Sequence, residues 1–168
     1  DDLMKSLRVY GHPPFGIAVI HGGPGPGGEM AAVARELQAD WGVLEPLQTE
    51  TSLEGQVNEL KAVLETSGEL PAILIGFSWG AWLSFIVSAK YPSLVRKLVL
   101  VGSGPFEHEY VGKIQATRLG RLSEDERAEY ESIIKALDSP DAEGKAVAFA
   151  RLGALASKTD EYDPMDRE

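Results

Sequence analysis

The sequence has no cysteine among its 168 residues. This absence excludes disulfide bonds and a catalytic thiolate, and it fits the cytoplasm, where we expect the protein to reside. Positive charge is also scarce, since 16 Lys and Arg against 26 Asp and Glu leave a formal net charge of −10. Nucleic acids and anionic membranes are bound through basic patches, so we expect neither as a partner.

Histidine is rare, and long hydrophobic runs are absent. His12, His21 and His108 are too far apart in the sequence to suggest a metal-ligand cluster, so no metal and no other cofactor is expected. No stretch approaches the roughly 18–20 apolar residues that span a bilayer. The chain is long enough to bury a real core, and its 43% hydrophobic content is typical of a globular protein.

One pentapeptide carries the strongest functional signal. Residues 71–76 read as a buried strand, which runs into Gly76-Phe77-Ser78-Trp79-Gly80. A helix is predicted next, because apolar residues follow at helical spacing: Trp82, Phe85, Ile86 and Ala89. Strand, serine turn and helix together form the context in which G-x-S-x-G holds a nucleophile, with Gly76 and Gly80 letting strand and helix approach. Ser78 is therefore the candidate nucleophile; the alternative is a serine that only caps the helix.

A glycine-rich loop follows another predicted strand, at residues 16–20. It reads His21-Gly22-Gly23-Pro24-Gly25-Pro26-Gly27-Gly28. Such a loop brings backbone N–H groups close to a ligand, and we predict that Gly23 and Trp79 donate to an oxyanion. Pro24 and Pro26 have no N–H to offer. The alternatives are a rigid loop without a ligand or a phosphate-binding turn, although the G-K-[ST] of a P-loop is missing.

Together, His21-Gly22-Gly23-Pro24-Gly25 and Gly76-Phe77-Ser78-Trp79-Gly80 resemble the α/β-hydrolase superfamily. Within that superfamily, the chain most resembles the proline iminopeptidases, which carry H-G-G-P-G and a tryptophan after the serine. That subgroup usually has glycine where this chain has Phe77, so we expect a generic hydrolase. The resemblance covers about residues 7–104 and implies a three-layer sandwich with a mainly parallel sheet.

The order of predicted elements agrees with that fold. Strands are expected at 7–10, 16–20, 43–47, 71–76 and 98–101, with helices between them near 29–39, after Thr51-x-x-Glu54 and at 79–90. The second of these helices should turn one apolar face inward, made of Leu53, Val57, Leu60 and Leu64. Both motifs then lie at the carboxyl ends of parallel strands, where ligands bind in such sheets.

Residues 105–168 show no strand pattern and are predicted to form a helical cap on the core of residues 1–104. Ser123-x-x-Glu126 is a capping box before a helix whose inward residues are expected to be Tyr130, Ile133, Ile134 and Leu137. Residues 138–141 should end that helix, and an alanine-rich helix should follow to about residue 157. The alternative is a helical layer that only completes the core.

A serine hydrolase also needs a base and an acid that orients it, which the resemblance places on strands after the serine. His108 is the only later histidine, and it lies at the start of the predicted cap. We assign His21 with Gly22 to shaping the glycine loop, His12 to the surface, and Glu107 and Glu109 to solvated positions. Residues 1–168 are therefore expected to be the N-terminal part of a longer hydrolase, which lacks its last strands.

Two functions follow from these patterns. The first is a serine hydrolase that cleaves an ester, amide or peptide bond of a small molecule or short peptide through an acyl-enzyme on Ser78. Phe77, Phe106 and Trp79 are its candidate pocket residues, whereas Trp82 is assigned to the core. The second is a binding or scaffolding module on a hydrolase fold that has lost its triad. In either case the open sheet edge is expected to pair with a second copy or with the missing C-terminal part.

Overall fold

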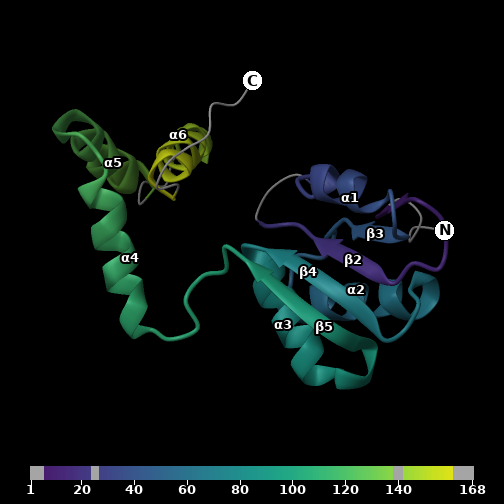
Figure 1. The fold of residues 1–168 in the computed structure, drawn as a ribbon. Coiled ribbons are helices and arrows are strands. Elements are labelled where there is room, and N and C mark those ends of the chain that lie inside the picture. Colours follow the sequence, from purple (N-terminus) through teal and green to yellow (C-terminus); the bar gives the residue numbers. More distant parts are fainter. Residues whose placement is uncertain (1–5, 24–26, 138–141, 161–168) are drawn as a thin grey trace. The chain divides into compact units, whose positions relative to one another are not determined.

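The computed structural model describes residues 6–23, 27–137 and 142–160 (Figure 1). Its contacts divide the chain into two compact units, Asp1–Gly104 and Pro105–Glu168. The first unit carries the sheet and the second is helical, and each is described separately below.

The first unit is built on a five-stranded sheet with the order β1-β3-β2-β4-β5. Strands β2, β3, β4 and β5 run parallel through the pairs β2–β3, β2–β4 and β4–β5, and β1 pairs antiparallel with β3 at one edge. The mainly parallel sheet predicted from the sequence is thus confirmed. The strands span Leu7–Tyr10 (β1), Ile17–Ile20 (β2), Val43–Pro46 (β3), Ala72–Phe77 (β4) and Val95–Val101 (β5).

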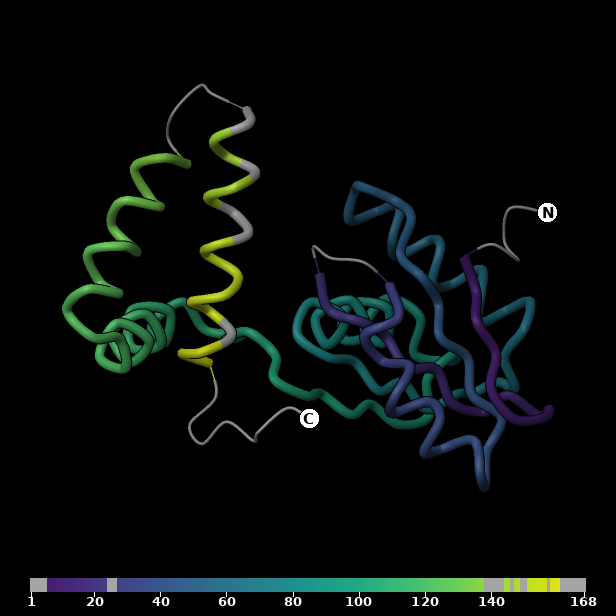
Figure 2. Tube along the Cα trace, turned by 90° about the horizontal axis from the view of Figure 1, so that it is seen from above, coloured from purple at the N-terminus to yellow at the C-terminus, as the bar shows by residue number. Residues whose placement is uncertain are grey.

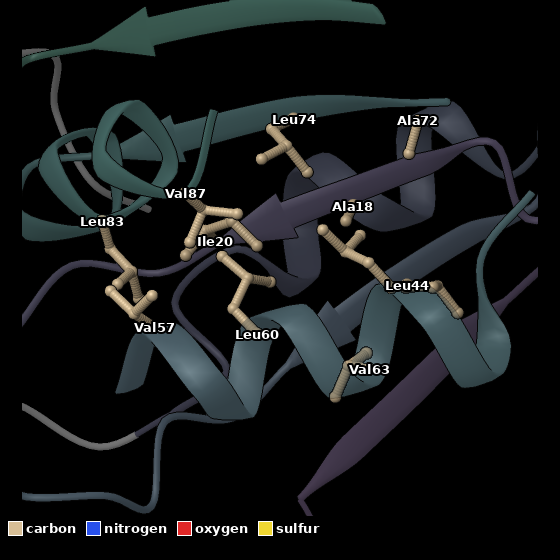
Figure 3. Close-up of a cluster of buried hydrophobic side chains, with 11 residues drawn as sticks. Ala18, Ile20, Leu44, Val57, Leu60, Val63, Ala72, Leu74, Leu83 and Val87 are labelled. Carbon is tan, nitrogen blue, oxygen red and sulfur yellow. The ribbon is translucent and has the colours of Figure 1, made fainter. Parts of the chain in front are cut away.

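Helices cover both faces of the sheet and make three layers (Figure 1). Helix α1 (Ala31–Leu37) packs on one face, and α2 (Leu53–Ser67) and α3 (Trp79–Lys90) pack on the other. Alternation along β2 supplies both interfaces, because Ile17 and Val19 join the α1 cluster while Ala18 and Ile20 join the other. Figure 3 shows side chains of α2 and α3 converging on Ile20.

Two details of the predicted helices were wrong. The N-cap of α2 is Ser52 and not Thr51, because the Ser52 hydroxyl accepts the Gly55 N–H at 3.0 Å. This shift leaves Leu53 50% exposed at the start of α2, while Val57, Leu60 and Leu64 are buried as predicted.

Helix α3 also buries a different face from the one predicted. Ala81, Leu83, Ser84 and Val87 are buried, while Phe85 is 41% exposed and packs edge-to-face with Trp82. Small residues on the sheet side let α3 lie close to the strands, so the larger rings are left on its outer side.

The second unit contains α4 (Glu109–Gly120), α5 (Glu124–Leu137) and α6 (Ala142–Asp160). Figures 1 and 2 show α5 and α6 side by side, with α4 running across them. Their small core contains Leu122, Ile133, Ala148 and Leu155. Ile134, predicted to face inward, is 38% exposed.

The Ser123 capping box is confirmed in both directions. The Ser123 N–H donates to Glu126 Oε2 at 2.9 Å, and the Glu126 N–H donates to Ser123 Oγ at 3.3 Å. The helix break predicted at 138–141 lies outside the described residues. The role of these helices as a cap remains a prediction.

Candidate active site

Ser78 occupies a strained turn between β4 and α3. Its φ of 53° and ψ of −116° make it the one non-glycine residue with positive φ in the described part of the chain. The Ser78 N–H donates to the Val101 carbonyl at 2.9 Å, whereas its side chain makes no capping hydrogen bond to α3. The hydroxyl therefore does not perform the capping role that was the alternative, and strain of this kind is concentrated at functional sites.

Gly76 and Gly80 make this turn possible by close backbone contact. A Cβ on Gly80 would lie 2.2 Å from the Ile20 carbonyl oxygen, at the end of β2. A Cβ on Gly76 would lie 2.3 Å from the Gly80 carbonyl oxygen, in the first turn of α3. Both contacts are with backbone, which cannot move aside as a flexible side chain can, so any larger residue would push the strand and helix apart.

The glycine loop after β2 lies directly beside Ser78. A Cβ on Gly22 would lie 3.2 Å from the Ser78 Cβ. The Gly22 N–H donates to Glu29 Oε2 at 3.1 Å and is therefore already occupied. The N–H groups of Gly23 and Trp79 meet no acceptor among the described residues, so they are the two candidate oxyanion donors. Pro24, Gly25 and Pro26, the rest of this motif, fall outside the described residues.

His21 is buried, with 2% of its surface exposed, and both of its ring nitrogens are occupied. The Gln48 N–H donates to Nε2 at 3.1 Å, so Nδ1 carries the hydrogen and donates to the Gly22 carbonyl at 2.6 Å. Gln48 also donates from Nε2 to the His21 carbonyl at 2.8 Å. These contacts hold the start of the glycine loop, and they leave no ring nitrogen free to take a proton from Ser78.

The other two histidines are not part of this loop. His12 sits at the opposite end of the sheet, because a Cβ on Gly42, just before β3, would lie 2.4 Å from the His12 carbonyl. His108 is the N-cap residue of α4 in the second unit.

A cleft of about 540 Å³ opens between the glycine loop and the segment after β3. It is lined by His21, Gly22, Gly23, Gln48, Thr49, Glu50, Thr51, Gln56 and Trp79. Trp79, a candidate pocket residue, is part of this lining. The ring of Phe77 instead packs with the α1 cluster, and Phe106 is a 44% exposed residue of the second unit.

Sequence reasoning missed four side chains that hold this site together. Gln48 fixes His21, and Glu29 occupies the Gly22 N–H. The Trp79 indole N–H donates to Gln56 Oε1 at 2.7 Å, and Glu59 accepts the Thr49 N–H at 3.0 Å. Gln48 follows the carboxyl end of β3 by two residues, a position that could have marked it as a candidate. Gln56 and Glu59 lie on α2 and Glu29 lies in the turn before α1, at spacings without a motif.

In the described residues, no group of three or more His, Asp or Glu side chains is arranged to hold a metal ion. No described helix combines the length and the apolar character needed to cross a bilayer.

A parallel sheet with a strained serine between strand and helix and a glycine loop beside it defines the α/β-hydrolase class. The sequence matches the α/β hydrolase fold over residues 17–132, and the chain belongs to this family. The narrower resemblance to proline iminopeptidases remains a prediction.

Several relatives support the same fold. A pyrrolizixenacetamide deacetylase from Xenorhabdus hominickii is 32% identical over 116 residues, which cover 61% of this chain and 42% of that protein. The crystal structure of VinJ matches 96% of this chain and 68% of its own, at 19% identity and a TM-score of 0.67. A putative lipase from Acinetobacter baumannii matches 91% of this chain and 56% of its own, at 18% identity and a TM-score of 0.56. The chain thus spans about half the length of the deacetylase and the lipase.

Proposed function

We propose that this chain carries the nucleophile and oxyanion site of a serine hydrolase. The observation that carries the proposal is the conformation of Ser78. Its hydroxyl caps no helix, its φ is positive, and it lies beside two N–H groups that meet no acceptor among the described residues. A helix cap alone gives no reason to maintain such a conformation, which costs about 1–3 kcal/mol.

The chemistry is acyl transfer to the Ser78 hydroxyl. Oγ forms a bond to the carbonyl carbon of an ester or amide while its proton passes to a general base. The carbonyl oxygen becomes negative and accepts hydrogen bonds from the Gly23 and Trp79 N–H groups. The intermediate then expels an alcohol or amine, which takes up the proton, and water hydrolyses the acyl-Ser78 ester.

We place the base and its orienting acid outside residues 1–168. Both ring nitrogens of His21 are occupied, and His12 lies at the wrong end of the sheet. His108 is the remaining histidine, and it begins α4 instead of following a later strand, where a hydrolase of this family carries its base. The partial coverage of the relatives' length leaves room for the two groups.

The proposal is tested by labelling the encoded full-length protein with a fluorophosphonate and locating the adduct by peptide mass spectrometry. Ser78 should be labelled, and Ser78→Ala should abolish the adduct. Ser103→Ala is the matched control, since Ser103 also follows a strand but has no positive φ, and it should label normally. A folded protein that stays unlabelled would favour the non-catalytic binding module.

The substrate class is proposed more coarsely, as an ester or amide. A relative named as a deacetylase supports an acyl group as small as acetyl. Turnover of p-nitrophenyl acetate should therefore equal or exceed that of proline β-naphthylamide. A clear preference for the proline substrate would instead support the iminopeptidase resemblance.

A further inference from the structure

The Gln56 side chain uses both ends of its amide at the candidate site. Its Oε1 accepts the Trp79 indole N–H at 2.7 Å, and its Nε2 donates to the Glu50 carbonyl at 2.9 Å. An indole N–H can only donate and a backbone carbonyl can only accept, so the partners fix the orientation of the amide. Gln56 thereby ties the residue after Ser78 to the segment that follows β3.

The Trp79 ring held by Gln56 also touches the glycine loop. A Cβ on Gly23 would lie 3.4 Å from Trp79 Cδ1 and 3.9 Å from Trp79 Cβ. Gly23 and Trp79 are the two candidate oxyanion donors, and they come from different strand ends. A shift of the indole ring would therefore act on the loop that carries the Gly23 donor.

The other end of the tether is itself anchored. The Glu59 carboxylate accepts the Thr49 N–H at 3.0 Å and the Glu50 N–H at 3.4 Å, and the Thr49 hydroxyl donates to it as well. Glu59 lies one turn after Gln56 on the same side of α2. Two residues of one helix thus hold the segment after β3, and Gln56 passes that position on to Trp79.

We propose that Gln56 is a positioning residue that sets the geometry of the oxyanion donors by holding the indole of Trp79. This inference rests on the proposed serine hydrolase function. Gln56 need not touch the reacting atoms; it acts through Trp79. Donors serve catalysis only at the right distance from the oxyanion, so loss of the tether should lower kcat more than it raises KM.

The test uses three variants of the full-length protein. Gln56→Met keeps the length of the side chain and removes both hydrogen bonds. Gln56→Glu keeps an acceptor for the indole N–H and loses only the donor to the Glu50 carbonyl, so it tests the contact with Trp79 separately from the other end of the tether. Asn58→Leu is the control, because it removes an exposed amide from the same helix two residues away, where no hydrogen bond to the site exists among the described residues.

Two readouts separate positioning from folding and from the function itself. The first is kcat and KM for p-nitrophenyl acetate. Gln56→Met should lower kcat about tenfold with KM changed less than about threefold, and both Gln56→Glu and Asn58→Leu should stay within about threefold of the parent. The second is the ¹⁵N-tryptophan NMR resonance of the Trp79 indole N–H, assigned with Trp79→Phe. It should move upfield in Gln56→Met and stay in place in the other two.

An indole resonance that moves in Gln56→Met without a fall in kcat would overturn the proposal. So would a kcat that falls equally in Gln56→Glu while its indole resonance stays in place. If Ser78 is never labelled by fluorophosphonate, the proposed function fails and the positioning role fails with it, whereas the resonance still reports whether the tether exists. A failed tether and a failed function therefore give different results.

Discussion

At the scale of single residues, the site depends on one strained serine between two glycines. Ser78 holds a φ of 53°, a region that L side chains rarely adopt. We predict that the free energy of unfolding of Ser78→Gly is higher than that of Ser78→Ala by about 1 kcal/mol. Glycine removes backbone strain of about 1–3 kcal/mol, and the greater entropy of its unfolded chain offsets part of this gain. Urea unfolding of the two variants measures the difference.

The matching pair at Ser103 controls for the glycine itself. Ser103 has no positive φ, so there Ser103→Gly should be less stable than Ser103→Ala. If the Ser78 pair shows the same order as the Ser103 pair, the turn is not strained.

The flanking glycines give a second prediction. Gly80→Ala places a methyl 2.2 Å from the Ile20 carbonyl oxygen, so it should destabilise the first unit by about 3 kcal/mol, at the upper end of overpacking costs. Gly112→Ala is the control, because its Cβ meets nothing within 4 Å on α4, and it should stabilise by about 0.5–1 kcal/mol. Thermal unfolding followed by circular dichroism distinguishes the two.

The sequence predicted some of these residues and not others, for a physical reason. Ser78, Gly76 and Gly80 belong to one short motif whose spacing is imposed by a single turn, so they can be found without a structure. Gln48, Gln56 and Glu59 act across elements that are distant in sequence, and each alone is an ordinary polar residue. The pairing of β3 with β2 brings Gln48 to His21, and the position of α2 brings Gln56 to Trp79 and Glu59 to Thr49.

At the scale of elements, local sequence patterns predicted which segments form strands and helices, but they did not predict which face of each helix is buried. The apolar spacing at Trp82 and Phe85 predicted the wrong buried face of α3, because small residues such as Ala81 and Ser84 pack against the sheet. In contrast, the Ser123 capping box was correctly predicted, since its two hydrogen bonds form within four consecutive residues.

The start of α5 carries a pH-dependent prediction. The hydrogen bond from Lys158 on α6, followed by that from the Ser123 N–H, lowers the pKa of Glu126 to about 2 from its ordinary value of 4.5. Because the folded pKa is the lower one, this contribution to stability is complete above about pH 4.5 and is lost as the pH falls toward 2. A ¹³C NMR titration should place the Glu126 midpoint near pH 2.

Lys158→Met should move that midpoint upward, toward the ordinary value. Arg151→Met is the control, since it removes the neighbouring α5–α6 ion pair with Glu129 and leaves Glu126 and Lys158 paired. A Glu126 midpoint that does not respond to Lys158→Met would contradict the assigned cause.

At the scale of the whole molecule, the edge strand β5 exposes apolar side chains to solvent. β5 is last in the strand order, and Val99, Leu100 and Val101 are 43%, 38% and 43% exposed. Exposed apolar edge strands are sites of pairing with another chain or segment. We therefore propose that β5 associates with a further C-terminal part or with a second copy of the chain.

The last prediction concerns catalysis by residues 1–168 alone. They contain the proposed nucleophile and oxyanion donors, but neither His12 nor His21 is placed to act as the base. Losing triad members typically removes several orders of magnitude in rate, and such losses overlap because the members act as a unit. We therefore expect p-nitrophenyl acetate turnover by residues 1–168 to be at least about a thousandfold slower than that of the encoded full-length protein. Comparable rates would require a base within this chain, and His108→Ala would then identify it, because His108 is the only histidine after Ser78.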